Sequence, residues 1–115
     1  MNSKQIFDSV LKNGGITLDR DLLAYSGSGY AVAVGKKFER VKDLGISFES
    51  FDMMLGYYLH LVPNTRYIGI WINMNRMIFD LIEIVADRDQ AIALGKQRKQ
   101  IAIFDFERNV TVSLT

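Results

Sequence analysis

The residues of this sequence that are best suited to chemistry are five acidic residues, which cluster in its last third. They are Asp80, Glu83, Asp87, Asp89 and Asp105. Paired carboxylates can hold a divalent cation, or divide acid and base roles when their environments differ. No HExxH or ExxH spacing accompanies them, so helix capping and solvated strand ends account better for the group. Asp80 and Asp105 are of most interest, since each interrupts an apolar strand, where a carboxylate needs a partner or an edge.

Other catalytic constellations lack essential members. His60 is the single histidine and the chain has no cysteine, which argues against a catalytic triad or a zinc site and excludes disulfides and thiol nucleophiles. The segment YSGSGY, residues 25–30, superficially resembles a phosphate loop but lacks the Lys-Ser/Thr that should follow. We therefore expect no catalytic residue, no metal site and no cofactor, and we do not expect an enzyme.

Two basic segments, GKKFERVK and GKQRKQ, are candidates for nucleic-acid binding. Their cations are Lys36, Lys37, Arg40, Lys42, Lys96, Arg98 and Lys99. If the segments meet in space, they could grip phosphates, with Tyr30 and Phe38 near the first; otherwise they are solvated faces. The formal net charge of +1 argues against binding through bulk charge, though not against a local patch.

Two other groups of residues are candidates for a protein interface. Met53 and Tyr57 lie off the main apolar stripe of their helix, and Met and Tyr are enriched at interfaces. The closing strand carries Val110, Val112 and Leu114, with no lysine, proline or inward charge to discourage pairing. Its open edge is expected to dock another protein or to form a homodimer.

Composition indicates one globular domain over residues 1–115. Hydrophobic residues make up 49% and charged residues 23%, which is an ordinary globular balance. The start of the chain lacks the apolar core of a secretory signal. The longest apolar stretch, MMLGYYLHLV, is too short and too polar to span a bilayer. We expect a cytoplasmic protein without membrane contact.

Three helices are predicted. The first follows a cap at Asn2 or Ser3 and stops at Gly14-Gly15. The second begins after Ser47 and ends before Pro63. Its helical stripe consists of Phe48, Phe51, Leu55, Tyr58, Leu59 and Val62. The third begins at Asp87, and its small residues suit a close approach to a sheet.

Strands are predicted at residues 16–18, 30–34, 38–44, 67–73, 77–85, 101–106 and 110–114. We expect residues 30–34 and 38–44 to form a hairpin, and helix 87–99 to connect strands 77–85 and 101–106 in the same direction. The predicted fold is α+β, with three helices packed on a mostly antiparallel sheet of about six strands as a single-layer sandwich.

Several short segments resemble a type of small protein found in phages, plasmids and other mobile elements. They include Gly14-Gly15-Ile16-Thr17, the GYAVA segment from Gly29, and the pattern of Tyr67, Gly69 and Trp71. The matching end of the chain consists of Asp80, Asp87, Ala91, Ile92, Leu94, Gly95, Gln100, Ala102, Ile103, Phe104 and Asp105. The chain departs from the type where Leu81 and Ile82 follow Asp80, a place where a serine is frequent. The resemblance implies a mobile-element context and no particular activity.

Two functional hypotheses follow. The first is a non-catalytic accessory protein of a phage or mobile element that binds a host or phage protein, for example as an inhibitor of a host defence system. The alternative is a nucleic-acid-associated module that uses residues 36–42 and 96–99.

Overall fold

The computed structural model describes residues 1–62 and 66–115 of the chain. Within these ranges the helices are α1 (Ser3–Asn13), α2 (Phe48–Leu61), α3 (Arg88–Gln97) and the short 3₁₀ helix η1 (Lys36–Phe38). The strands are β1 (Gly15–Leu18), β2 (Tyr30–Ala33), β3 (Arg40–Asp43), β4 (Tyr67–Asn73), β5 (Arg76–Val85), β6 (Ala102–Asp105) and β7 (Val110–Ser113). The predicted helix end at Pro63 lies outside the described residues. No helix in the described ranges is long and apolar enough to cross a membrane.

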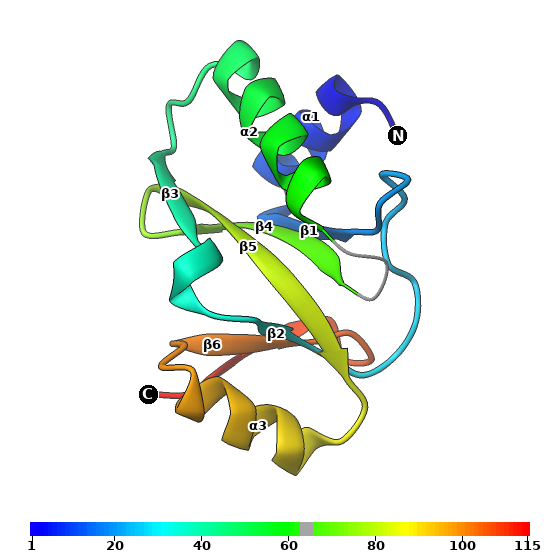
Figure 1. Ribbon diagram of the computed structural model, residues 1–115, viewed down its shortest axis with the longest axis vertical. Coiled ribbons are helices and arrows are strands. Elements are labelled where there is room, and N and C mark those ends of the chain that lie inside the picture. The colour runs from blue at the N-terminus through cyan, green and yellow to red at the C-terminus, as the bar shows by residue number, and fades with distance from the viewer. Residues whose placement is uncertain (63–65) are drawn as a thin grey trace.

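The strands form one antiparallel sheet, curled into a half-barrel, in the order β1-β4-β5-β2-β6-β7 (Figure 1). β5 is the longest strand and pairs with β4 along one edge. Its other edge is shared: β3 pairs with residues 76–79 and β2 pairs with residues 82–85. Helices packed on an antiparallel sheet confirm the predicted α+β class.

The predicted hairpin between residues 30–34 and 38–44 is wrong. β2 and β3 each pair with β5, and η1 carries the chain from one to the other along the β5 edge. The β5 strand has enough unpaired edge for both short strands, which local sequence does not reveal. As predicted, α3 connects two strands that run in the same direction, since β5 and β6 are both antiparallel to β2. However, β5 and β6 are not neighbours, since β2 lies between them.

Each of the three α-helices begins at a side-chain cap. In α1, the Asn2 side chain accepts a bond from the Gln5 amide at 2.8 Å, and the Gln5 side chain accepts one from the Asn2 amide at 2.9 Å. Asp87 similarly accepts a bond from the Gln90 amide at the start of α3. α1 ends at Gly14, whose φ of 88° favours glycine. These local signals place the helix boundaries where the sequence predicts them.

The helices cover one face of the sheet, with α1 and α2 at one end of the molecule and α3 at the other (Figure 1). The stripe of α2 packs on Met77, Phe79 and Leu81 of β5, as the helical spacing predicts. The Tyr58 hydroxyl lies within hydrogen-bond distance of the carbonyl oxygens of Phe38 and Phe79. Helix α2 is therefore joined to β5 and to the segment that leads into β3.

The small residues of α3 allow it to lie close to the sheet. Ala91 is fully buried, and a Cβ placed on Gly95 would lie 2.5 Å from the Leu114 Cδ1 atom. Around them, Val32, Val85 and Ile103 form a second core cluster. Successive side chains along a strand point to opposite faces of the sheet. The neighbours of these core residues along their strands, including Ala31, Ala33 and Ile82, therefore form a third cluster on the other face.

Candidate functional site

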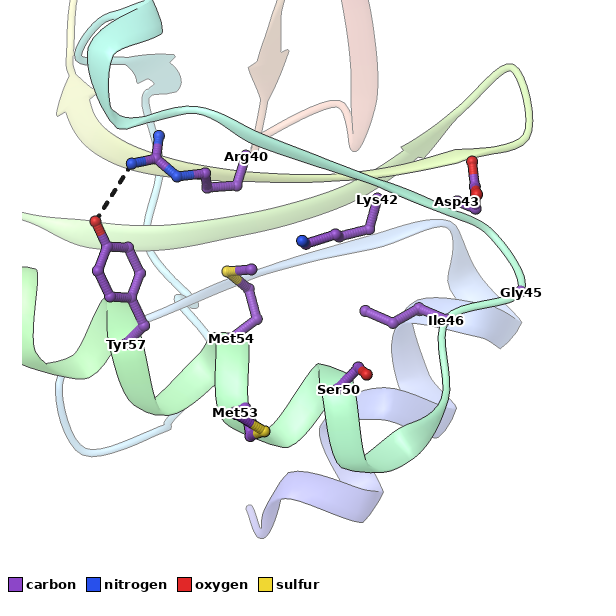
Figure 2. A pocket seen from close by; sticks show the side chains of 9 residues that line it. All are labelled: Arg40, Lys42, Asp43, Gly45, Ile46, Ser50, Met53, Met54 and Tyr57. Carbon is purple, nitrogen blue, oxygen red and sulfur yellow. Dashed lines mark hydrogen bonds between the residues drawn. The ribbon is translucent and has the colours of Figure 1, made fainter.

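A pocket of about 830 Å³ lies between α2 and β3 (Figure 2). We call it the α2–β3 pocket, and its lining residues are Arg40, Lys42, Asp43, Gly45, Ile46, Ser50, Met53, Met54 and Tyr57. Arg40 lies opposite Phe79 and Lys42 opposite Met77, so both cations are on the face of the sheet that carries α2. The pocket therefore unites two protein-interface candidates, Met53 and Tyr57, with two nucleic-acid candidates.

Arg40 is held in place at one end of this pocket. Its Nη1 atom donates to the carbonyl oxygen of Glu39 at 2.8 Å and of Lys37 at 3.3 Å. Its Nη2 atom lies 3.4 Å from the Tyr57 hydroxyl, and the guanidinium lies over the Tyr57 ring. Lys42, in contrast, extends toward α2 without a hydrogen bond or ion pair among the described residues (Figure 2). The pocket thus combines one fixed and one adaptable cation.

Apolar atoms of the pocket are open to solvent. The exposed fraction of Met53 is 77% and that of Tyr57 is 43%, so neither residue belongs to the core. This agrees with their positions off the α2 stripe. Exposed methionine and tyrosine beside cations are typical of protein-binding surfaces.

The two basic segments lie on the same side of the molecule (Figure 1), but two of their cations are paired with acidic side chains. Lys36 is 3.9 Å from Glu39, and Arg98 forms an ion pair of 2.6 Å with Glu83. Arg98 also donates to the Ala33 carbonyl oxygen, which places the end of α3 beside the segment leading to η1. Lys37, Lys96 and Lys99 are exposed. The arrangement gives a dispersed set of charges rather than a closed phosphate grip.

The closing strand β7 is the last strand in the sheet order. Val112 and Leu114 pack against the core cluster beneath α3, whereas Val110 is 46% exposed. The first two side chains are therefore only partly accessible to a partner. What β7 offers is its outer backbone edge.

The acidic residues do not converge. Within the described ranges no three histidine or acidic side chains lie close enough to hold a metal ion. His60 lies on the exposed side of α2. Asp105 accepts bonds from the amides of Glu107 and Arg108 at 3.0 and 3.2 Å, so it organises a turn. The Asp105 side chain lies on the same face of the sheet as Ile103, beneath α3, whereas Asp80 lies on the opposite face. The two carboxyl groups therefore do not form a pair.

Asp80 is the exceptional carboxyl group, with an exposed fraction of 3%. Its Oδ2 atom lies 3.4 Å from the Trp71 Nε1 atom, and its Oδ1 atom has no partner among the described residues. Burial, followed by the nearby Glu39 carboxylate, raises the pKa of Asp80 from 3.8 to about 7. The Trp71 hydrogen bond and the Lys36 ammonium oppose this rise. A group that titrates near neutral pH in a recess is a candidate for binding.

Sequence reasoning identified Asp80 but not its surroundings. Trp71 and Gly69 face Asp80 from β4 and line its recess. The sequence does not indicate this, because an apolar strand predicts that Trp71 belongs to the core. The period-two pattern Tyr67-x-Gly69-x-Trp71 was the available signal, since it places all three side-chain positions on one face. No family model, curated protein or solved structure matches this chain.

Proposed function

We propose that this chain is a non-catalytic protein-binding module that takes an acidic, extended segment of another protein along β3, beside α2. The observation that carries the proposal is the α2–β3 pocket, where exposed Met53 and Tyr57 lie next to two cations and a strand edge without a neighbour in the described ranges. Helix, strand and cations together form a surface suited to main-chain pairing and side-chain selection.

The backbone of β3 supports strand addition. The Leu44 amide donates to the Asn75 carbonyl oxygen, which fixes the alternation of the ladder between β3 and β5. By that alternation the backbone groups of Arg40 and Lys42 point to β5, and those of Val41 and Asp43 point away. An incoming strand would therefore bond to the main chain of Val41 and to the Asp43 amide, since the Asp43 carbonyl oxygen already accepts a bond from the Ile46 amide at 3.1 Å. Its alternate side chains would then lie over α2.

Charge favours an acidic occupant over a second copy of this chain. Arg40 and Lys42 face the pocket, and Asp43 is the one acidic residue among its described lining residues. Two copies of β3 would bring these cations together, and like charges across a strand pair are destabilising. Glutamate or aspartate on the incoming strand would instead be attracted.

A matched pair of peptides tests the proposal. The probes are capped peptides of about eight residues, the length of an ordinary strand, that alternate valine with glutamate or with lysine. We expect the glutamate peptide to shift the amide resonances of residues 40–43 and 53–57 in NMR titrations, and the lysine peptide to leave them unchanged. Equal binding of both peptides, or shifts confined to other residues, would refute the proposal.

Three variants locate the interaction. Lys42→Glu reverses the adaptable cation, and Val41→Pro removes an outward amide that an edge strand does not need for its own pairing. Both should weaken binding of the glutamate peptide by about tenfold or more. Lys96→Glu, a matched charge reversal on exposed α3, is the control and should leave affinity within about twofold. Equal losses in Lys42→Glu and Lys96→Glu would indicate bulk charge instead of a site.

The alternative proposal is a nucleic-acid-associated module, favoured by the placement of both basic segments on one side of the molecule. It requires binding of a single-stranded oligonucleotide that weakens steeply with salt. Simultaneous replacement of Lys36, Lys37, Lys96 and Lys99 by glutamine should abolish such binding. Absence of binding at low salt removes this alternative. The mobile-element and defence-inhibitor context stays a prediction that rests on the resemblance alone.

A further inference from the structure

The face of the sheet turned away from the helices carries a second recess, which we call the sheet groove. Its volume is about 910 Å³, and its lining includes Tyr25, Ala31, Trp71, Asp80, Phe104 and Phe106. The floor is formed by positions with small side chains, Ala31, Ala33 and Gly69, and aromatic rings stand around it. A recess of this size and character is typical of small-molecule sites.

Aromatic packing builds the rim of the groove. The Tyr25 ring lies 4.6 Å from the Phe106 ring and 5.3 Å from the Tyr67 ring, and Phe104 lies 5.3 Å from Phe106. These rings come from β4, from β6 and the residue after it, and from the loop between β1 and β2, so the tertiary structure assembles the rim. Their faces are electron-rich and attract cations.

The Asp80 carboxyl group lies on the floor, directly across from Gly69 in the β4–β5 ladder. Ile82 lies over Gly69 on one side of it, and the Trp71 indole bounds it on another. The Trp71 Nε1–Asp80 Oδ2 separation of 3.4 Å exceeds the usual range for such a bond, so the indole is weakly held. Rotation of the indole would open Asp80 to the groove.

We propose that the sheet groove binds a small organic cation with a flat apolar body, such as an amidine or an aromatic amine, through the Asp80 carboxylate. Among the groove-lining residues that the structure describes, Asp80 supplies the one carboxyl group. An N–H donor of the ligand satisfies Oδ1, which has no partner among the described residues, and the ligand's flat body lies against the Trp71 indole. A neutral apolar ligand would leave that oxygen unsatisfied, and an anion would be repelled.

Binding of a cation selects the ionised form of Asp80, so affinity should rise with pH. The groups that act electrostatically on this carboxyl are Glu39, Lys36 and Tyr58, together with the Trp71 N–H. Glu39 and burial favour the protonated acid, whereas Lys36 and Trp71 favour the carboxylate. Because the pKa of Asp80 is about 7, binding should strengthen between mildly acidic and mildly basic pH and then level off.

Titration with benzamidine, compared with the neutral isostere benzamide, tests the site. We expect benzamidine at about pH 8 to shift the Trp71 indole N–H resonance and the amides of residues 69, 80 and 82, with an affinity about tenfold or more above that at pH 5.5. Benzamide should bind at least about tenfold more weakly at the higher pH. Equal affinity of the two probes, or no shift at millimolar benzamidine, would overturn the proposal.

Two substitutions separate a site from a general aromatic surface. Asp80→Asn preserves shape and should reduce benzamidine affinity by about tenfold or more and remove its pH dependence. Lys42→Glu, which alters only the α2–β3 pocket, is the control and should leave benzamidine binding unchanged. If Asp80→Asn does not fold, Trp71→Phe serves as the second variant. It retains an aromatic ring but lacks the indole N–H that competes for Asp80, so its benzamidine binding should keep the pH dependence. Retention of full affinity in a folded Asp80→Asn variant, or no pH dependence in Trp71→Phe, would contradict the assignment.

Discussion

The Ile82 side chain fills the space above Gly69: a Cβ on Gly69 would lie 2.6 Å from the Ile82 Cγ1 atom and 2.9 Å from its Cδ1 atom. The two residues come from neighbouring strands, β4 and β5, on the groove face of the sheet. Glycine at position 69 is therefore required by a neighbour and not by the backbone, since its φ is not in the left-handed region. This contact sets the shape of the groove floor next to Asp80.

The first prediction concerns this contact. Gly69→Ala should lower the free energy of unfolding by about 1–3 kcal/mol, because Ile82 must leave its position. Ile82→Ala should cost about 2–5 kcal/mol through lost packing. In the double variant the added methyl group occupies vacated space, so the combined loss should be smaller than the sum. Urea denaturation of the four proteins measures the coupling, and strictly additive losses would show that the two side chains do not compete.

The second prediction concerns pH. The native pKa of Asp80 is about 7 and its ordinary value is 3.8, so between these values the native state keeps a proton that the unfolded state loses. The contribution of Asp80 to stability is therefore complete below about pH 4 and is lost as pH rises through about 7, by roughly 4 kcal/mol. As pH rises over this range, the unfolding free energy of the parent should fall by that amount relative to that of Asp80→Asn, whose side chain does not titrate. A difference that stays constant from about pH 4 to pH 8 would show that the native carboxyl titrates normally.

The third prediction concerns α2, where two neighbouring apolar residues should behave differently. Leu55 is buried in the main core cluster, and Leu55→Ala should destabilise the protein by about 2–5 kcal/mol. Met53→Ala on the same helix is the control, because the Met53 side chain is exposed, and its effect should lie within about 0.5 kcal/mol. Thermal and urea unfolding measure both. Similar losses in the two variants would mean that Met53 is covered in solution.

The fourth prediction concerns the edge of β7. The Leu114 amide donates to the Ile101 carbonyl oxygen, so by alternation the Thr111 and Ser113 amides point away from β6. This edge carries no charged side chain, and we expect it to pair with a second copy of the chain. Sedimentation at micromolar concentration should show a dimer for the parent and a monomer for Thr111→Pro, which removes one outward donor. A monomeric parent contradicts the prediction, as does a Thr111→Pro variant that is still dimeric.

The sequence by itself determined the elements whose causes are local. Capping side chains at Asn2 and Asp87, glycine at position 14 and the helical stripe from Phe48 specify where helices begin, end and bury a face. The turn at Met74 and Asn75, both in the left-handed region, joins β4 to β5 in the short gap between the predicted strands 67–73 and 77–85. Such signals depend on neighbours within a few residues, so they can be read without knowing the fold.

Only the tertiary structure decided which strands pair and which side chains meet. β2 and β3 are adjacent in sequence, yet both pair with β5, because a ten-residue strand offers edge enough for two short ones. That choice creates the α2–β3 pocket, and the sheet brings Trp71, Tyr25 and Phe104 into the lining of the groove that contains Asp80. Strand pairing is a competition among distant segments whose free energy depends on shared packing, and residue spacing along the chain does not encode its outcome.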